Sequence, residues 1–367
     1  MIDNLLIKPA GPNCNLSCDY CFYLGKEEIY PGKTRMDLST ADLMISQVME
    51  KGDPVTFSWQ GGEPTLMGLD FFREVIELQK KHGHGGQSVS NTIQTNGTLL
   101  NEKWANFLSR YNFLVGLSLD GPRDLHDHHR KYPNGDGSYK DVKKKIQLLQ
   151  DHGVQFNVLT VLTSKNVKQP KRLVNFFRQQ GIKHFQFIPA IETEQTEGGE
   201  EIARFSPSPE EIANFFDTVF GMWSESFPPS FSVRYFEALI NAQLGRRPGI
   251  CRLDEQCGSY LVVEHNGDVY PCDFYVEEEW KLGNLRKTQL EEIADGNRFK
   301  KFAQKKASIP KECNNCEFLI YCEGGCQRYR GLPGGPNRKT YLCEAYRSFL
   351  DRNRARIEDI AKKARQM

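Results

Sequence analysis

Short apolar segments alternate with longer amphipathic segments from residue 5 to about residue 191. The apolar segments have the length of buried strands, and the amphipathic ones repeat apolar residues with the period of a helix. The expected strands are Leu5–Lys8, Val55–Trp59, Ser90–Thr95, Leu114–Leu119, Phe156–Leu162 and His184–Ile188. The expected helices span residues 39–50, 69–82, 101–110, 138–151 and 168–180. Strands that alternate with helices in this way form a parallel sheet with right-handed crossovers.

Six such β/α units are too few to close an eight-stranded barrel, so the sequence predicts an α/β fold built as an open, partial (β/α)6 barrel. Polar, glycine-rich segments follow four of the expected strands, at residues 14–21, 61–64, 96–97 and 118–121. Each of these segments taken alone is explained as an ordinary turn. Four of them at the carboxyl ends of parallel strands indicate a ligand site, because such folds bind their ligands at that edge.

Capping and turn residues predict where helices begin and which elements follow residue 191. Ser39 with Asp42, Asn101, and Ser138 with Asp141 are expected to begin helices. Ser208, Pro209 and Glu211 predict one more helix that ends near residue 226, and residues 192–207 are expected to form an exposed loop. Asn266-Gly267, between residues 260–265 and 268–272, predicts a β-hairpin. The basic stretch 344–363 predicts a final helix.

The eleven cysteines are distributed unevenly. Three lie at positions 14, 18 and 21, none between 22 and 250, and eight between 251 and 343. The opening residues lack the basic and apolar regions of a signal peptide, so the thiols are expected to stay reduced and available for metal. The distribution therefore predicts two metal-binding regions separated by a cysteine-free scaffold.

Charge and hydropathy exclude several classes of function. Lys and Arg together number 48 and Asp and Glu 47, so the net charge is +1 and no broad nucleic-acid surface is expected. No run of 18 apolar residues occurs, so no membrane span is expected either. The sequence predicts a soluble, cytoplasmic protein.

The spacing of Cys14, Cys18 and Cys21 supplies three thiolates from one loop. Structural zinc takes four ligands and four-iron clusters are usually held by four cysteines, so three cysteines either borrow a distant ligand or leave one iron open. With Tyr20 before the last cysteine and Gly61-Gly62-Glu63-Pro64 after the next strand, the chain resembles the radical S-adenosylmethionine superfamily. The resemblance implies the partial barrel and a 4Fe–4S cluster on the three cysteines, whose fourth iron binds S-adenosylmethionine.

The same resemblance implies the residues that contact S-adenosylmethionine. Tyr20 would lie against the adenine and Gly62 at the methionine end, with Ser118 and Arg130 as further contacts and Ile191 packed on the adenine. Without the resemblance, Ser118 is explained as a loop cap and Arg130 as part of a surface ion pair.

Seven of the distal cysteines, from Cys257 to Cys343, and Gly267 are similar to the SPASM extension of peptide- and protein-modifying radical enzymes, and Cys251 supplies an eighth thiolate. The resemblance implies two auxiliary 4Fe–4S clusters, and hence three clusters in all, although structural zinc is the alternative for the CxxC pair. One auxiliary cluster would be held by Cys251, Cys257, Cys272 and Cys326, and the other by Cys313, Cys316, Cys322 and Cys343. The implied domains are a radical S-adenosylmethionine barrel over 1–235, a SPASM domain over 236–343 and a C-terminal helix over 344–367.

Within this group the chain resembles the anaerobic sulfatase-maturating enzymes. The residues that carry this resemblance are Leu6–Pro9, Cys21–Tyr23, Gln60–Leu66, Gln94–Thr98, Leu119–Pro122 and Tyr270–Tyr275. It implies conversion of a cysteine or serine in an unfolded or nascent sulfatase segment into Cα-formylglycine, with an electron donor such as ferredoxin or flavodoxin. Asp273 would be the general base of this reaction; read by itself, it is a turn or capping aspartate.

Two other functions stay open from the sequence. The first is a SPASM enzyme that cross-links or epimerises a ribosomal peptide; many of these carry a leader-recognition domain, which is not expected here because Cys14 comes so early. The second is a non-catalytic iron–sulfur electron carrier, in which the three-cysteine loop would have no role. His126, His128 and His129 are expected to lie in a polar loop rather than to bind metal.

Overall fold

The computed structural model describes residues 4–32, 34–333 and 338–366, which form two compact units. The first unit comprises Met1–Ser118, Asp127–Phe156 and Gly258–Phe302, and the second comprises Leu119–His126, Asn157–Cys257 and Ala303–Met367. In these described stretches no helix has the length and apolar character needed to cross a membrane.

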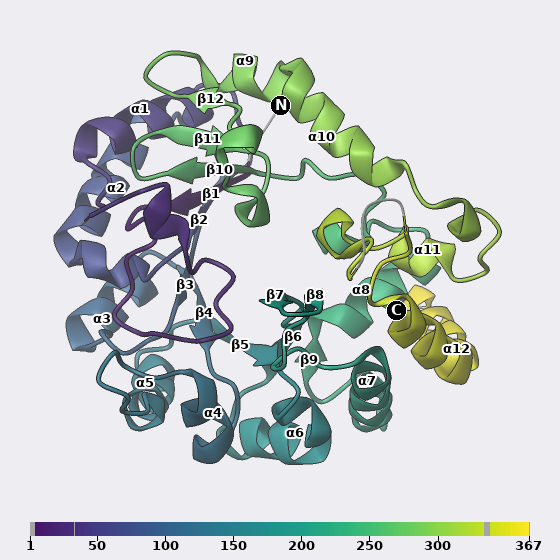
Figure 1. Ribbon diagram of the computed structural model, residues 1–367. Coiled ribbons are helices and arrows are strands. Elements are labelled where there is room, and N and C mark those ends of the chain that lie inside the picture. The colour runs from purple at the N-terminus through teal and green to yellow at the C-terminus, as the bar shows by residue number, and fades with distance from the viewer. Residues whose placement is uncertain (1–3, 33, 334–337, 367) are drawn as a thin grey trace. The chain divides into compact units, whose positions relative to one another are not determined.

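The sheet of the first unit runs in the order β12-β11-β10-β1-β2-β3-β4 (Figure 1). Its strands are β1 (Asn4–Lys8), β2 (Val55–Trp59), β3 (Val89–Thr95), β4 (Leu114–Ser118), β10 (Leu261–Glu264), β11 (Asp268–Tyr270) and β12 (Gly283–Asn284). The strands β1 to β4 pair in parallel, whereas β10, β11 and β12 pair antiparallel with one another. β10 also pairs in parallel with β1, so the predicted hairpin extends the sheet of the N-terminal strands.

Four helices of the first unit begin and end close to their predicted positions: α1 (Leu38–Met49), α2 (Leu69–His82), α3 (Glu102–Arg110) and α5 (Tyr139–Asp151). The short helix α9 (Leu290–Asp295) of the same unit was not predicted. Asn101 caps α3 as predicted, but α1 begins one residue before Ser39 and is capped by the Asp37 carboxylate, which accepts the Thr40 N–H. Ser138 precedes α5 without capping it, because its hydroxyl donates to the Arg130 carbonyl instead.

The second unit contains the strands β5 (Phe156–Leu162), β6 (His184–Pro189) and β9 (Ser232–Val233), which pair in parallel in that order. Its helices are α6 (Pro170–Gln179), α7 (Pro209–Trp223), α8 (Arg234–Gln243), α11 (Leu319–Cys322) and α12 (Cys343–Arg365). The capping box at Ser208 and Glu211 is present at the start of α7. Two further helices, α4 (Arg123–His129) and α10 (Asn297–Ala307), each have residues in both units.

Two segments predicted as loops are ordered elements. Residues 192–207 contain an antiparallel hairpin of β7 (Thr193–Thr196) and β8 (Gly199–Ile202). Its side chains are exposed or half-buried, so the sequence shows no apolar alternation that would have identified it. The histidine-rich run lies in α4 rather than in a polar loop, and His126 is fully buried.

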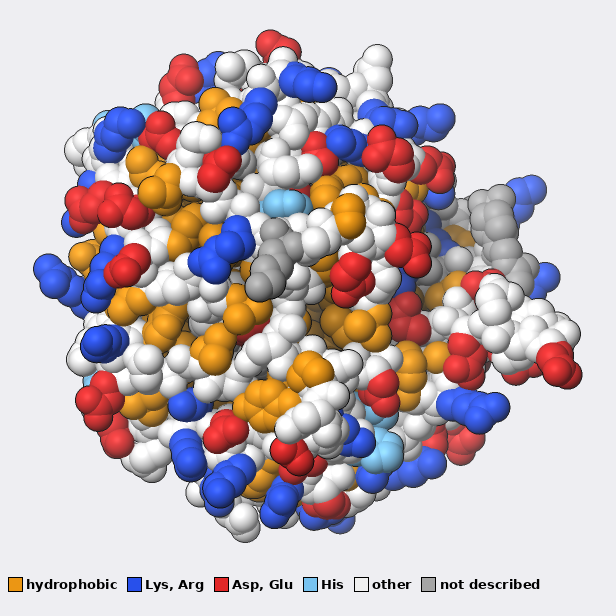
Figure 2. All heavy atoms as spheres, turned by 60° about the vertical axis from the view of Figure 1, so that its left-hand side comes forward, with side chains coloured by type: hydrophobic (Ala, Val, Ile, Leu, Met, Phe, Trp, Pro, Cys, Tyr) orange, Lys and Arg blue, Asp and Glu red, His pale blue; other side chains and the backbone are white. Residues whose placement is uncertain are grey.

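Aromatic side chains fill the interior of both units. In the first, Trp59 and Phe72 meet edge to face with their ring centroids 5.5 Å apart. In the second, Phe349 of α12 contacts Phe220 of α7 and Phe236 of α8. Burial of such rings supplies most of the hydrophobic stabilisation of a fold of this size. On the face drawn in Figure 2, acidic and basic side chains are interspersed, as the net charge of +1 leads one to expect.

Candidate functional site

The three-cysteine loop follows β1 at the carboxyl end of the parallel strands. The Leu16 N–H and the Asn96 side-chain amide lie 3.4 and 3.8 Å from the Cys14 sulfur. Desolvation, the Glu63 carboxylate and the Cys21 thiol together raise the pKa of the Cys14 thiol to about 11, although the hydrogen bonds from Leu16 and Asn96 lower it in part. Cys14 and Cys21 therefore lie within electrostatic range of each other, and nearby N–H donors suit the thiolates that bind a cluster.

The neighbouring Gly-Gly-Glu-Pro loop is held by a buried carboxylate. Glu63 accepts the hydroxyl protons of Thr65 and Thr95 and the backbone N–H of Asn96, the last at 2.8 Å. Gly62 has φ +51°, and a Cβ on it would lie 2.1 Å from the Asn13 carbonyl oxygen. Only glycine fits there, because the loop passes directly against the backbone that leads into the three cysteines.

The residues predicted to contact S-adenosylmethionine lie in both units. Tyr20 and Arg130 face each other in the first unit, with the guanidinium carbon 5.5 Å from the ring centroid, and both are buried. Arg130 is thus a buried residue whose guanidinium lies over an aromatic ring. Ser118 is buried at the end of β4. Ile191 is buried in the second unit, two residues after β6.

Asp273 lies in the first unit together with the three-cysteine loop. Its carboxylate accepts hydrogen bonds from the Tyr260 hydroxyl at 3.0 Å and from the Gln60 amide at 3.3 Å. The rings of Phe22 and Phe274 contact each other with centroids 4.7 Å apart. Gln60 immediately precedes the glycine loop, and Phe22 immediately follows Cys21. The segment Asp273–Phe274 therefore contacts a residue adjacent to each of the two predicted motifs.

A buried charged group that the sequence analysis missed lies beside this site. Lys8 and Glu264 are register partners on β1 and β10, and both are fully buried. The Tyr23 hydroxyl donates to Glu264, and the Lys8 ammonium nitrogen lies 4.0 Å from the centroid of the Tyr23 ring. Burial and the Glu264 charge raise the pKa of Tyr23 well above its ordinary value, so Tyr23 is a neutral donor. The sequence contains a sign of these two residues, because Lys8 and Glu264 each end an otherwise apolar strand segment.

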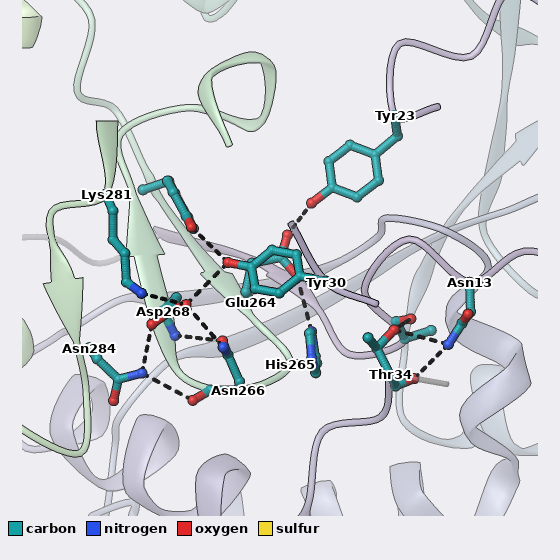
Figure 3. Close-up of polar contacts among 12 residues, drawn as sticks. Asn13, Tyr23, Tyr30, Thr34, Glu264, His265, Asn266, Asp268, Lys281 and Asn284 are labelled. Atoms are coloured by element: carbon teal, nitrogen blue, oxygen red, sulfur yellow. Dashed lines mark hydrogen bonds and ion pairs between the residues drawn. The ribbon is translucent and has the colours of Figure 1, made fainter. Parts of the chain in front are cut away.

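Figure 3 shows the Tyr23–Glu264 hydrogen bond and, beside it, a second network of polar contacts around Asp268 of the hairpin. Tyr30 donates to Asp268 at 3.2 Å, and Asp268 also binds the Lys281 ammonium at 2.9 Å and the Asn284 amide at 2.8 Å. Burial would raise the pKa of Asp268, but these amides and the Lys281 charge more than offset it and lower the pKa. The network fixes β11 and β12, and with them the segment that carries Asp273.

Seven of the eight distal cysteines lie in the second unit, where they form two neighbourhoods. Burial raises the pKa of Cys322 to about 12, and Cys316, Cys313 and Cys343 contribute to the rise. These four residues are the predicted ligands of one auxiliary cluster.

The other predicted set is divided between the units. Burial raises the pKa of Cys257 to about 11, with Cys326 as the next cause, and both cysteines lie near Lys306, as does Cys251. The fourth predicted ligand, Cys272, belongs to the first unit, beside Asp273.

These thiols fit iron–sulfur clusters in number and chemistry. The structure pairs none of the eleven cysteines in a disulfide, and all eleven are among the described residues. No three His, Cys, Asp or Glu side chains of the described stretches converge closely enough for one metal ion. The ligands of a four-iron cluster stand farther apart, so this finding concerns single ions only.

The fold and the three-cysteine loop define a class of protein. Residues 9–177 match the family model of the radical SAM superfamily, and residues 251–317 match that of an iron–sulfur cluster-binding domain, SPASM. This is a radical S-adenosylmethionine enzyme with a cysteine-rich C-terminal extension, which confirms the predicted fold class.

Relatives that match over nearly the whole chain show the family within this superfamily. The chain is 35% identical over 364 residues to a cysteine-type anaerobic sulfatase-maturating enzyme of Clostridium perfringens, covering 98% of both chains. It is 36% identical to a serine-type enzyme of Bacteroides thetaiotaomicron, covering 94% of this chain and 88% of the relative. A solved structure described as native anSMEcpe with bound AdoMet and Cp18Cys peptide matches with a TM-score of 0.90 at 34% identity, over 98% of this chain and 99% of that one. The chain belongs to the family of anaerobic sulfatase-maturating enzymes.

Proposed function

We propose that the chain oxidises a cysteine or serine side chain in an unfolded or nascent sulfatase segment to Cα-formylglycine. The observation that carries this proposal is the position of Asp273: its carboxylate accepts a hydrogen bond from Gln60, next to the glycine loop, and the ring of Phe274, the residue after it, contacts Phe22, the residue after Cys21. The relative's complex with AdoMet and a peptide supports a peptide substrate. Identity to cysteine-type and serine-type relatives is nearly equal, so both side chains are included in the proposal.

In this proposal Cys14, Cys18 and Cys21 hold the first 4Fe–4S cluster. With S-adenosylmethionine this cofactor supplies, when bound, the 5′-deoxyadenosyl radical that removes a hydrogen atom from the substrate Cβ. The proposed contacts of S-adenosylmethionine are Tyr20, Gly62, Ser118, Arg130 and Ile191. Tyr20 offers a buried aromatic ring, of the kind an adenine packs on, with the Arg130 guanidinium carbon 5.5 Å from its centroid.

The chain's own part in the oxidation is to position the substrate and to accept its proton. Asp273 takes the proton from the substrate thiol or hydroxyl, while Tyr260 and Gln60 hold its carboxylate in place. For a cysteine substrate, water then replaces sulfur at the oxidised carbon. Tyr23 stays neutral and presents a fixed ring beside Lys8.

The eight distal cysteines would hold two further 4Fe–4S clusters that take up the second electron of the oxidation. The proposed sets are those of the sequence analysis, as are the domain borders 1–235, 236–343 and 344–367. A ferredoxin or flavodoxin would supply the reducing electron, and the enzyme would act in the cytoplasm without contacting nucleic acid or membrane.

A mass-spectrometric assay tests the activity. The holoenzyme is incubated anaerobically with reductant, S-adenosylmethionine and a sulfatase-derived peptide that carries either cysteine or serine at the target position. Replacing CH2SH by CHO lowers the mass by about 18 Da, and replacing CH2OH by CHO lowers it by about 2 Da, in a cofactor-borne oxidation. We expect one or both shifts, and none with an alanine peptide. A cross-linked or epimerised peptide without aldehyde would contradict the proposal in favour of another SPASM activity.

The iron content tests the number of clusters. Three sets of three, four and four cysteines account for all eleven, so the anaerobically reconstituted chain is expected to hold about 12 iron atoms. Iron and zinc are measured together by elemental analysis. About four iron atoms with stoichiometric zinc would mean that the distal cysteines form zinc sites.

A further inference from the structure

A buried lysine lies among three of the distal cysteines. Lys306 is in the last turn of α10 and is fully buried. Its ammonium nitrogen has no hydrogen-bond partner among the described residues. Desolvation lowers the pKa of Lys306 and the Arg330 guanidinium lowers it further, whereas the thiols of Cys257, Cys326 and Cys251 favour its charged form. A buried, unpaired ammonium is costly unless an anion lies beside it.

The cysteines around Lys306 can supply the negative charge that a buried ammonium group needs. Cysteines that bind iron do so as thiolates, so a loaded cluster site is a concentrated negative charge. The Gln327 amide, also buried, donates to the Cys257 sulfur at 3.4 Å. The Gln327 amide therefore contacts one of the three sulfurs that also act electrostatically on Lys306.

Arg330 provides an instructive contrast. It too lies within range of distal thiols, those of Cys313, Cys326, Cys257 and Cys322. Its guanidinium, however, donates to the backbone carbonyls of Gly324 and Ser308 at 3.0 and 3.1 Å, and so anchors the chain around Cys322 and Cys326. Lys306, in contrast, makes no side-chain hydrogen bond to the described residues that would hold the backbone in place. Its ammonium group is buried without such a structural role.

We infer that Lys306 is an electrostatic tuning residue, which raises the reduction potential of the auxiliary cluster held by Cys251, Cys257 and Cys326 above that of the second auxiliary cluster. This inference rests on the proposed assignment of the distal cysteines to clusters. Uptake of one electron makes a cluster one charge more negative, so a fixed positive charge nearby favours the reduced form. In the oxidation the substrate loses a hydrogen atom from Cβ, a proton from its S–H or O–H group, and one electron. The cluster with the higher reduction potential is the better acceptor for that electron. Gln327 acts in the same direction through its hydrogen bond to sulfur.

The test is a potentiometric titration followed by electron paramagnetic resonance. The full chain carries Cys14→Ala, Cys18→Ala and Cys21→Ala in every sample, so that only auxiliary clusters contribute to the spectra. Lys306→Met is compared with Lys306→Arg, which keeps the charge, and with Lys305→Met, which removes an exposed charge one residue away. Iron content is measured on each sample.

At a fixed ambient potential we expect Lys306→Met to lower the reduced-to-oxidised ratio of one auxiliary cluster about tenfold, a shift of about 59 mV to more negative potential. The other cluster is expected to change less, and Lys306→Arg and Lys305→Met are expected to match the parent. Unchanged potentials at full iron content would overturn the role of Lys306 and leave the clusters in place. If the Met variant does not assemble, Lys306→Gln is titrated instead and read by the same criterion. A parent chain without auxiliary-cluster signals would overturn the cluster assignment itself, and the inference with it.

Discussion

Replacing Cys14, Cys18 and Cys21 together by alanine is expected to abolish reductive cleavage of S-adenosylmethionine. The three thiols come from one loop after β1, and the glycine loop packs against the backbone that leads into them. Alanine supplies no ligand, so the iron that would bind S-adenosylmethionine has no site. Release of 5′-deoxyadenosine, measured by chromatography under reducing conditions, should fall to the background of a reaction without enzyme.

The distal cysteines serve as the internal control of this experiment. All eight are outside the substituted loop, and seven of them belong to the second unit. The triple variant should therefore lose about four of about 12 iron atoms and keep the spectra of the other clusters. If 5′-deoxyadenosine is still produced, the radical arises elsewhere and the N-terminal loop has another role.

Local patterns predicted the barrel strands closely. β2 and β5 begin and end where the sequence placed them, because short apolar runs bounded by polar loops depend on neighbouring residues alone. The three-cysteine loop and the glycine loop were predicted for the same reason. Both have fixed spacing, and their positions after parallel strands follow from the β/α alternation.

Contacts between distant segments could not be predicted in this way. The hairpin of β10 and β11 was expected, but its pairing with β1 was not, and that pairing joins segments more than 250 residues apart. It is this pairing that places Asp273 and Cys272 in the unit of the first three cysteines. Nothing in the local sequence around these two residues indicates which strand the hairpin pairs with.

The partners of the candidate base likewise come from the fold. Tyr260 precedes β10 and Gln60 follows β2, and nothing in either local sequence indicates that both donate to Asp273. The buried Lys8–Glu264 pair gave a readable signal, since each charge ends an otherwise apolar strand. Interpreting it required the parallel register of β1 and β10, which periodicity does not supply.

Changing Asp273 to asparagine is expected to separate radical formation from product formation. Asparagine keeps the shape of the side chain and an oxygen that accepts from Tyr260, but it has no negative charge and is a far weaker proton acceptor. General-base catalysis contributes about 10²–10⁴-fold, so formylglycine formation should fall by about that factor. Cleavage of S-adenosylmethionine at the three-cysteine loop needs no proton from this position, so 5′-deoxyadenosine should still appear.

The two products are measured in the same reaction, the nucleoside by chromatography and the aldehyde by mass spectrometry. Asp295→Asn is the matched control, because it makes the same chemical change at an exposed aspartate of the same unit. Iron content shows whether the change beside Cys272 disturbs a cluster. With iron intact, a wild-type yield of formylglycine from Asp273→Asn would mean that another group accepts the proton. The hydrogen bonds from Tyr260 and Gln60 would then serve to hold a turn rather than a base.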